Sequence, residues 1–479
     1  MSVVLVFIAI LILVRLIQRY FNIIQSGYRI DGPWFIPFIG NAQFIWNMKP
    51  NALFSRVERL RETYQRTFRI FLGTNLWVFL HSPEEMRKAL NEDSLERADT
   101  FQQLEVLLGD GLLLSEGKRW YNHRRALAPA FHPNVLASFT DRIYYHADVF
   151  IDRVLNRKEV EISDYIFPCM LDTICDTSMG KNLRTQEDDF SPYVHAFHET
   201  SELLFQRMSY PPYFLDCIFN LTNASKRLKK SIAMIHNLTD EVIKEKADSL
   251  KTDKNHQPAE KYNRTLLQIL LTTEIDGKPV SFQEIKDEVN TFLFAGVDTT
   301  AAAMSFIFYC MGKYSECQEK LYKEISSDPD CYSNINEIKY LDMFIKECLR
   351  LYTIVPLTGR QVTKEITIGS TNLIPGTTLW VNMYGLAHDP KYFPQPYEFN
   401  PERFGSDATE IPPYVFLPFS GGPHSCIGKR YAMLIMKILT VRALKRTRVQ
   451  LKNPNEKLEL MAEMVLKSTN GIHLKFEKR

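Results

Sequence analysis

One short stretch, residues 419–432, constrains this chain more than any other part of its sequence. Its residues, FSGGPHSCIGKRYA, place Cys426 after a Gly-Gly-Pro turn and before an apolar run with helical spacing at Ala432, Ile435, Met436 and Leu439. The pattern predicts a tight loop that brings one sulfur to the N-terminus of a helix. Free peptide N–H groups and the positive end of the helix dipole favour the thiolate there. Gly422 and Gly428 flank the sulfur, and without a Cβ they let a flat group approach the backbone.

A lone thiolate of this kind is a poor ligand set for structural zinc but suits the axial position of a haem iron. Taken by itself, a cysteine beside a helix is more often a buried small hydrophobe. The spacing of Phe419, Gly422, His424, Cys426 and Gly428 nevertheless resembles the haem-binding loop of the cytochrome P-450 superfamily. His424 stands where arginine is commoner, and either side chain can donate to a haem propionate. The resemblance implies haem b, with Cys426 as the axial ligand of its iron and with Phe419 and His424 as haem contacts.

The composition is that of a globular chain without an electrostatic signature for nucleic acid. The 479 residues are 45% hydrophobic, and the formal net charge is only +2. The eight cysteines show neither metal-ligand spacing nor the spacing of a disulfide framework, which suits a reducing compartment; they are Cys169, Cys175, Cys217, Cys310, Cys317, Cys331, Cys348 and Cys426.

The N-terminus predicts a retained membrane anchor at residues 1–24. An unbroken apolar run covers residues 3–14 and continues around Arg15 and Arg19, which can extend the span by reaching toward the interface. A cleaved signal peptide would need positive charge before the run and small residues after it, and neither is present. Because the positive charge follows the run, we expect a lumenal N-terminus and a catalytic body in the cytosol, at the endoplasmic reticulum membrane.

After the anchor, the sequence predicts a stiff connection and then a single catalytic domain at 41–479. Residues 25–40 contain Pro33, Pro37 and Gly40, and their spacing resembles the proline-rich hinge of microsomal members of the family. The expected fold class is mainly α with small β-sheets, an α+β architecture of the cytochrome P-450 type. Residues 66–80 are predicted as two short strands, and Ser82 as the cap of a helix. An Asn470-Gly471 turn predicts a hairpin at residues 466–476.

A long helix is expected to begin at the capping box formed by Ser281 and Glu284 and to run to about residue 311, or about 45 Å at 1.5 Å per residue. At its middle stand Asp298 and Thr299, residues that compete with the backbone for hydrogen bonds. A structural kink is one interpretation. The other is the AGxDT motif that the stretch resembles, in which Asp298 and Thr299 pass protons to iron-bound dioxygen. Small residues at Ala295 and Gly296 would leave room for the cofactor.

Two further arginines and a tryptophan belong to patterns that place them at the cofactor in the family. Trp120 and Arg124 are four apart, so on a helix they share a face. They resemble the WxxxR motif, whose tryptophan and arginine donate to a haem propionate. Arg360, ten residues after Arg350, matches another propionate-binding arginine.

A further motif predicts a buried structural triad. Glu347 and Arg350 are three apart, a spacing that is common on any helix, but residues 401–404 read Pro-Glu-Arg-Phe and lie just before the cysteine loop. The combination resembles the ExxR and PERF motifs, in which Arg403 joins Glu347 and Arg350. Its role would be scaffolding, because losing one partner leaves a buried charge at a cost of about 3–5 kcal/mol.

The resemblance extends from Pro33 to the end of the chain and implies a haem-thiolate monooxygenase. Such an enzyme uses two electrons, two protons and dioxygen to insert one oxygen atom into a lipophilic substrate such as a fatty acid, a hormone-like lipid or a xenobiotic. No GxGxxG motif follows a predicted strand, so we expect NADPH–cytochrome P-450 reductase to supply the electrons, with cytochrome b5 as an optional second donor. A docking face for an acidic partner is predicted from five basic residues: Lys118, Arg119, Arg125, Lys429 and Arg430.

The residues 419–437 and 286–300 look most like the family-four clan. Many members of that clan carry a glutamate at the position of Ala295 that becomes esterified to haem, so here the haem should be non-covalent. Two other functions stay open, a haem-thiolate isomerase or dehydratase that needs no dioxygen and a non-catalytic haem-binding membrane protein. The intact Asp298 and Thr299 argue against the first. Residues 205–221 are expected either to roof the substrate pocket and contact the membrane or to form a buried helix end.

Overall fold

The computed structural model describes residues 2–41, 52–252, 264–327 and 335–479, so Cys331 lies outside the described residues. Contacts between residues divide the chain into two compact units. The sheet unit comprises Met1–Thr100, Pro356–Pro394 and Ile411–Ser425, and the helical unit comprises Phe101–Val355, Gln395–Glu410 and Cys426–Arg479. Residues 41–479, predicted as one catalytic domain, contribute to both units. Helices predominate and the sheets are small, which confirms the predicted fold class.

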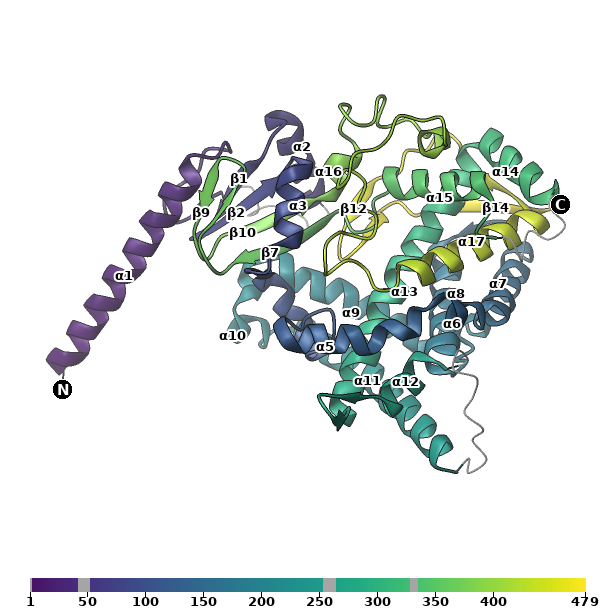
Figure 1. Cartoon of the computed structure of the whole chain (residues 1–479), viewed down its shortest axis with the longest axis horizontal. Coiled ribbons are helices and arrows are strands. Elements are labelled where there is room, and N and C mark those ends of the chain that lie inside the picture. The colour runs from purple at the N-terminus through teal and green to yellow at the C-terminus, as the bar shows by residue number, and fades with distance from the viewer. Residues whose placement is uncertain (1, 42–51, 253–263, 328–334) are drawn as a thin grey trace. The chain divides into compact units, whose positions relative to one another are not determined.

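The sheet unit is built on one five-stranded sheet (Figure 1). In spatial order its strands are β1 (Phe68–Leu72), β2 (Asn75–Leu80), β10 (Thr378–Asn382), β7 (Leu357–Val362) and β3 (Leu95–Arg97). The antiparallel pair of β1 and β2 confirms the two strands predicted at residues 66–80. On one face Phe68 and Phe79 are fully buried and stack with ring centroids 4.9 Å apart. Stacked aromatic side chains therefore form part of the buried core of this unit.

Helices α2 (Ala52–Tyr64), α3 (Pro83–Asn91) and α16 (Met383–Ala387) and the hairpin of β8 (Ile366–Ile368) and β9 (Thr371–Leu373) complete the sheet unit. The predicted cap of α3 is confirmed. The Ser82 side chain accepts from the backbone of Glu85, and the Glu85 side chain accepts from the backbone of Ser82. Both free N–H groups at the start of α3 are thereby satisfied.

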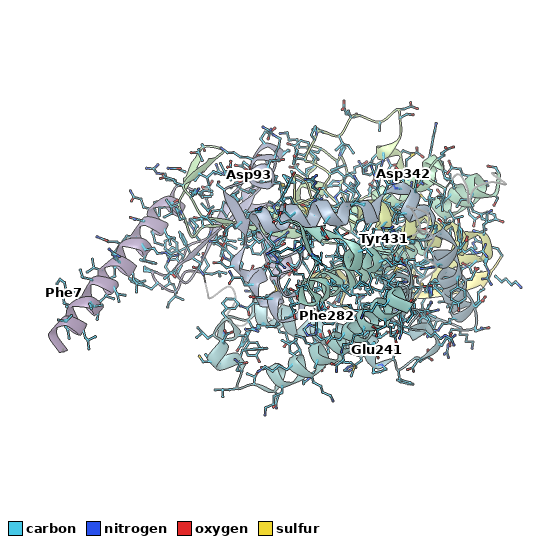
Figure 2. The ribbon with its side chains drawn as sticks, turned by 60° about the horizontal axis from the view of Figure 1, so that its bottom comes forward. Phe7, Asp93, Glu241, Phe282, Asp342 and Tyr431 are labelled. Atoms are coloured by element: carbon cyan, nitrogen blue, oxygen red, sulfur yellow. The ribbon has the colours of Figure 1, made fainter. Side chains whose placement is uncertain are left out.

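Helix α1 (Ser2–Tyr28) leaves the sheet unit beside β9 as a long straight rod, and the side chain of Phe7 stands out from it in Figure 2. The span Val4–Tyr28 has a mean hydropathy of 2.2 and only 6% of it is buried, so it is long and apolar enough to cross a membrane. The helix extends four residues beyond the anchor predicted at 1–24. At its end Gly27 packs against the sheet, because a Cβ there would lie 2.7 Å from the Phe71 ring.

The segment that follows α1 is held by Arg69 of β1. This side chain is 6% exposed, and its guanidinium donates to the carbonyl oxygens of Gly27 at 3.0 Å and Pro33 at 3.1 Å. It also lies 5.1 Å from the ring centroid of Phe35 and 4.9 Å from that of Phe71. One buried cation therefore orders both the end of α1 and the proline-containing segment predicted as a hinge.

The helical unit surrounds α13 (Phe282–Lys313), which begins at the predicted capping box of Ser281 and Glu284. Helices α8, α11 and α17 lie against it. The larger helices of this unit are α7 (Thr140–Leu155), α8 (Ser163–Ile174), α9 (Pro192–Ser209), α11 (Asn223–Thr252), α14 (Ser315–Ser327), α15 (Lys339–Leu351) and α17 (Lys429–Arg446). The shorter ones are α4 (Glu105–Leu108), α5 (Gly117–Leu127), α6 (Pro133–Ala137), α10 (Asp216–Phe219) and α12 (Leu266–Thr272). Helix α13 also passes a test of length and apolarity for membrane spans, but 78% of it is buried, as in the core helix of a soluble body.

The hairpin predicted around Asn470-Gly471 is wrong. Strand β13 (Leu466–Ser468) pairs with β12 (Leu460–Ala462), whereas β14 (His473–Lys478) pairs with β11 (Thr447–Leu451) and β4 (Val160–Glu161). The turn does form, with Gly471 at a φ of 72°. The Asn470 side chain, however, accepts from the backbone of Glu459 and donates to the carbonyl of Lys457. Tertiary hydrogen bonds therefore send the two strands into different sheets. A two-stranded sheet of β5 (Glu274–Ile275) and β6 (Lys278–Pro279) precedes α13.

The stretch at residues 205–221 ends α9 and includes a 3₁₀ turn at Pro211–Phe214 followed by α10. Phe219 is buried, as the interpretation of a helix end requires. Most of its apolar neighbours are exposed, however; they are Tyr210, Phe214, Leu215, Ile218 and Leu221. The segment therefore combines one buried residue, Phe219, with an exposed apolar patch.

We expect Arg69→Met to loosen the segment after α1. Methionine keeps the apolar stem but leaves the Gly27 and Pro33 carbonyls without their donor, at a cost of about 1–3 kcal/mol for each buried group. Thermal unfolding should shift downward, and limited chymotrypsin digestion should cut faster within residues 25–40. Arg66→Met is the control, because Arg66 is 70% exposed and pairs with Asp31 at the surface. Equal digestion of both variants would contradict the proposed role of Arg69.

Candidate active site around Cys426

The first half of the cysteine loop belongs to the sheet unit and is fixed against the end of α3. Gly422 has a φ of 69°, and a Cβ there would lie 2.1 Å from the carbonyl oxygen of Leu90. Nearby, the Asn91 amide donates to the Tyr414 hydroxyl at 2.7 Å. Gly422 is therefore required by a left-handed backbone and a close approach to α3, which is a different reason from the room for a flat cofactor expected from the sequence.

Cys426 begins the helical-unit part of the loop, three residues before α17, as predicted. Gly428 is the N-cap of α17, and its backbone N–H interacts with the Cys426 sulfur. Burial raises the pKa of the Cys426 thiol, although the Gly428 N–H and the charges of Arg124 and Lys429 act to lower it. The helix N-terminus thus acts in the expected direction but does not outweigh burial. A bound iron would decide the ionisation, since a metal deprotonates the thiol that coordinates it.

Trp120 and Arg124 lie on α5 and share a face, as the spacing predicts. The Arg124 guanidinium carbon lies 5.6 Å from the centroid of the Trp120 ring. Burial lowers the pKa of Arg124, and the Cys426 thiolate opposes that shift, so the two groups are electrostatic neighbours. The helical unit therefore brings a cation and an indole donor to the same side as the sulfur.

Helix α5 and the loop before it are fastened to α13 by buried acids that sequence reasoning missed. Glu288 is fully buried; its Oε1 lies 2.8 Å from His123 Nδ1 on α5, and its Oε2 accepts from the backbone N–H of Leu112 at 3.1 Å. Asp287 accepts from the backbone of Asp110. Two features of the sequence could have revealed these contacts: the adjacent acids Asp287 and Glu288 in the predicted long helix, and two glycines in the apolar stretch at residues 101–117.

Those glycines, Gly109 and Gly111, interrupt the apolar stretch at residues 101–117 because the loop touches α13. A Cβ at Gly109 would lie 2.1 Å from Asp287 Oδ1, and one at Gly111 would lie 2.2 Å from Thr291 Oγ1. Gly109 also has a φ of 54°. The loop between α4 and α5 is thus held against the central helix.

The sheet unit gathers three basic side chains. Arg360 of β7 is 5% exposed and stands opposite Arg97 of β3 in the antiparallel register, so both point to the same face. An Arg97 terminal nitrogen lies 3.5 Å from His424 Nδ1. Phe419, in the same loop as His424, is half-buried. Like charges at this spacing repel unless an anion joins them, so the cluster fits the carboxylates of a haem. Arg97 was missed, because a basic residue at the end of a strand carries no distinguishing signal.

The middle of α13 is helical throughout. The Thr299 hydroxyl donates to the Ala295 carbonyl at 2.7 Å, and Ala295 itself is partly exposed. Gly296 does not join Ala295 on this face. A Cβ at Gly296 would lie 3.2 Å from Ile174 of α8, so Gly296 permits packing between helices instead of contact with a cofactor.

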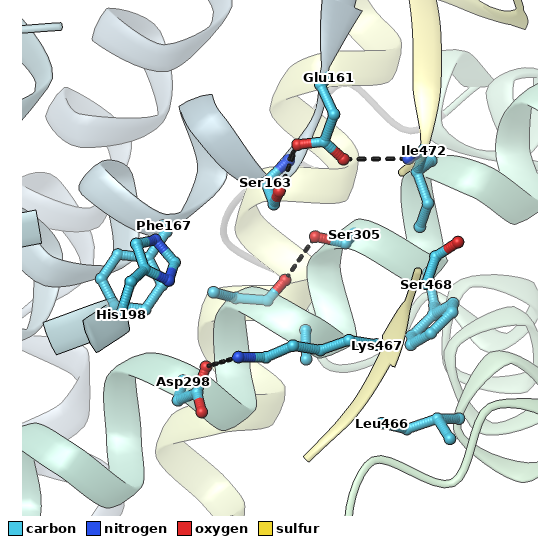
Figure 3. Close-up of a pocket in the computed structure, with 13 residues that line it drawn as sticks. Glu161, Ser163, Phe167, His198, Asp298, Ser305, Leu466, Lys467, Ser468 and Ile472 are labelled. Atoms are coloured by element: carbon cyan, nitrogen blue, oxygen red, sulfur yellow. Dashed lines mark hydrogen bonds and ion pairs between the residues drawn. The ribbon is translucent and has the colours of Figure 1, made fainter. Parts of the chain in front are cut away.

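Asp298 points to another side of α13 from Thr299, since adjacent residues on a helix lie about 100° apart. Its carboxylate lies 3.4 Å from Lys467 Nζ of β13 in a cavity with both polar and apolar walls (Figure 3). The side chain is 9% exposed, and its Oδ2 makes no hydrogen bond within the described part of the chain. The acid and the hydroxyl of the predicted proton pathway are therefore neighbours in sequence that face different surroundings.

Glu347, Arg350 and Arg403 lie together in the helical unit. Arg350 donates to both oxygens of Glu347, at 2.7 and 2.9 Å, and to the carbonyl of Pro396. Arg403 Nε lies 3.4 Å from Glu347 Oε1. Glu347 and Arg350 are 0% exposed, so charge pairing and carbonyl acceptors compensate the desolvation of both ions.

Arg350→Met should destabilise the protein by about 3–5 kcal/mol, because it leaves the fully buried Glu347 carboxylate without the cation that donates to both of its oxygens. Lys346→Met on the same helix is the control; its ion pair with Asp342 is partly exposed and should contribute less than about 1 kcal/mol. Chemical denaturation measures both. Similar stability of the two variants would exclude a scaffolding role for Arg350.

The donor set fits a haem better than a protein-ligated metal. Among the described residues no group of three or more His, Cys, Asp or Glu side chains could hold a metal ion. A single cysteine with the Arg124 guanidinium as its electrostatic neighbour offers one sulfur ligand and would leave the other ligand positions of an iron to a porphyrin.

Comparisons with known proteins agree with this geometry. Residues 30–476 match the family described as Cytochrome P450. The chain is 32% identical to Cytochrome P450 4d2 of Drosophila melanogaster over 94% of each chain. It is 32% identical to Cytochrome P450 4V2 of Homo sapiens, over 92% of this chain and 88% of that protein. The chain therefore belongs to the cytochrome P450 family, within its family-four clan, and is a monooxygenase whose haem iron is ligated by a cysteine thiolate.

Proposed function

We propose that this monooxygenase inserts one atom of dioxygen into a C–H bond of a lipophilic substrate, with electrons from NADPH delivered by NADPH–cytochrome P-450 reductase. Substrate, dioxygen, two electrons and two protons give the hydroxylated product and water. When bound, a thiolate-ligated haem supplies the redox chemistry, because the sulfur donates electron density that favours cleavage of the O–O bond. The observation that carries the proposal is the acid–hydroxyl pair Asp298-Thr299 at the centre of α13, in the same unit as Cys426.

Each site residue has a distinct proposed role. Cys426 ligates the iron. Trp120, Arg124, Arg360 and His424 donate to the haem propionates, with Arg97 added by its 3.5 Å contact with His424. Phe419 contacts the haem. Ala295 borders the haem and cannot form an ester with it, so the haem is held without a covalent bond.

Asp298 and Thr299 manage protons. A buried carboxylate can accept a proton from water and release it to a neighbouring acceptor, and a hydroxyl can both donate and accept. Thr299 already donates to the Ala295 carbonyl, so its free lone pairs are available to accept. An oxygen-independent isomerase would have no use for this pair.

The partner and membrane assignments rest on exposed groups. The docking face for the reductase comprises Lys118, Arg119, Arg125, Lys429 and Arg430; within it Lys118 pairs with Asp276, and Arg119 pairs with Asp110 and Glu284. Cytochrome b5 would use the same face as an optional donor. We place the protein at the endoplasmic reticulum membrane through α1, with its body in the cytosol, and assign the exposed patch on the 3₁₀ turn and α10 to a second membrane contact.

The test of this function begins with the difference spectrum of the dithionite-reduced membrane fraction with and without carbon monoxide. We expect a strongly red-shifted Soret band that is absent in Cys426→Ala. Lipophilic substrates are then incubated under labelled dioxygen with and without reductase. Product that carries one label and needs reductase supports the function. Unlabelled product formed without reductase would instead identify an isomerase or dehydratase, and a normal spectrum with no turnover on any lipophilic class would favour a non-catalytic haem protein.

Asp298→Asn and Thr299→Ala should uncouple turnover. Removing the acid or the hydroxyl slows proton delivery, so NADPH oxidation should release hydrogen peroxide while product formation falls about 10²-fold, at the lower end of typical general acid–base contributions. The matched control is Thr300→Ala, which removes the neighbouring buried hydroxyl. Product, peroxide and NADPH are measured together. Full coupling in both variants would remove Asp298 and Thr299 from the proposal.

A further inference from the structure

The cavity beside Asp298 has a volume of about 170 Å³ and lies within the helical unit. Its walls come from β4, α8, α9, α13 and β13 and from Ile472, which precedes β14. Figure 3 shows Lys467 crossing it from β13 toward Asp298 on α13. Hydroxyl groups of Ser163, Ser305 and Ser468 also line it. Apolar side chains, among them Phe167, Phe306 and Ile472, form the rest of the wall. A space of this size has room for several water molecules, each of which occupies about 30 Å³ in the liquid.

Lys467 is shared between two carboxylates. Its Nζ lies 3.4 Å from Asp298 Oδ1 and 3.4 Å from Glu463 Oε2. Burial acts to lower the pKa of Lys467, but the charges of Asp298 and Glu463 outweigh it and raise the pKa, so the ammonium stays charged at neutral pH. Neither contact is short. The lysine can therefore turn between its two partners without breaking a tight bond.

Asp298 depends on that ammonium. Only 6% of the residue is exposed, and Lys467 is the charged side chain that contacts its carboxylate. Its Oδ2 is buried and has no hydrogen-bond partner among the described residues, although Asp298 lines the cavity. A buried carboxylate oxygen normally has a partner, and a water in the cavity would supply one.

The other titratable groups that face the cavity do not replace Lys467. On α9, His198 has its pKa lowered to about 4 by burial and by the charge of Lys467, so it is neutral at physiological pH. Beside the cavity, burial raises the pKa of Glu463, and the negative charges of Asp298 and of Glu202 on α9 raise it further, while Lys467 acts to lower it. At β4, Glu161 is occupied with the backbone N–H groups of Ser163 and Ile472. Lys467 is thus the cation that balances Asp298 within this cavity.

We propose that the cavity is the route by which protons reach α13, and that Lys467 is the positioning residue that directs the Asp298 carboxylate into it. Two protons pass from solvent through cavity water to Asp298 in each turnover. The Asp298 side chain then turns along α13 to release each proton on the Thr299 side and returns to Lys467, which moves between Asp298 and Glu463. The inference rests on the proposed proton role of Asp298.

The first experiment compares Lys467→Met with Lys467→Arg and with Lys475→Met, an exposed lysine on β14. We expect product formed per NADPH to fall about tenfold in Lys467→Met, to recover largely in Lys467→Arg and to stay unchanged in Lys475→Met. Turnover driven by an organic hydroperoxide needs no protons from this route and should change less than twofold. Unchanged coupling in Lys467→Met, or an equal loss on both routes, would overturn the proposal.

A double variant shows whether Lys467 acts through Asp298. Asp298→Asn combined with Lys467→Met should be no more uncoupled than Asp298→Asn alone, because interacting residues are not additive. Additive losses would contradict the mechanism. If Asp298→Asn itself stays coupled, the proposed proton role of Asp298 fails; if it uncouples and Lys467→Met does not, only the role of Lys467 fails.

A labelling experiment tests the route without turnover and covers the case in which Lys467→Met does not fold. Ala302 lines the cavity, whereas its neighbour Ala303 is equally small and buried but does not line it. In the holoenzyme, Ala302→Cys should react with a small charged thiol reagent at least tenfold faster than Ala303→Cys, as measured by peptide mass. Equal protection of both cysteines would show that the cavity does not admit water and would overturn the proposal.

Discussion

The arrangement of the segments around α13 depends on the acidic side chains that this buried helix carries. Asp287, Glu288 and Asp298 lie on α13, and each is at most 6% exposed. Leaving such groups without partners is costly, so each must find a donor or a cation in another segment. Glu288 pairs with His123 and accepts from the backbone N–H of Leu112, Asp287 accepts from the backbone N–H of Asp110, and Asp298 pairs with Lys467. These polar contacts, together with apolar packing, position the loop before α5, α5 itself and β13.

The same constraint recurs with cations in both units. Arg350 is fully buried and is balanced by Glu347 and by peptide carbonyls, and Arg69 is balanced by carbonyls and aromatic faces. Such ions stabilise little in themselves, but any arrangement that separates them from their partners is strongly penalised. They therefore select one arrangement of the chain. In the helical unit this selection holds the segments that carry Trp120, Arg124 and Cys426, the residues proposed to bind one cofactor.

Local signals were reliable where the structure is decided locally. Capping boxes at Ser82 and Ser281 and the short hairpin of β1 and β2 form as predicted, because their partners lie within a few residues. The spacing of Trp120 and Arg124 likewise survives, since a helix fixes which residues share a face. Prediction failed where a distant partner competes. The Asn470 turn binds residues 457 and 459, and this redirects the strands on either side of it.

By itself the sequence determined the family, the fold class and the positions of the cysteine loop, the long helix and the triad motifs, because these are patterns of a few residues at fixed spacing. Tertiary structure alone decided which side chains meet across the chain. Arg97 reaches His424 over 327 positions, Gly422 is required by the carbonyl of Leu90, and Lys467 becomes the counter-ion of Asp298. No local pattern encodes such pairs, since they arise when burial forces each charged group to find whichever partner the folded chain brings within reach.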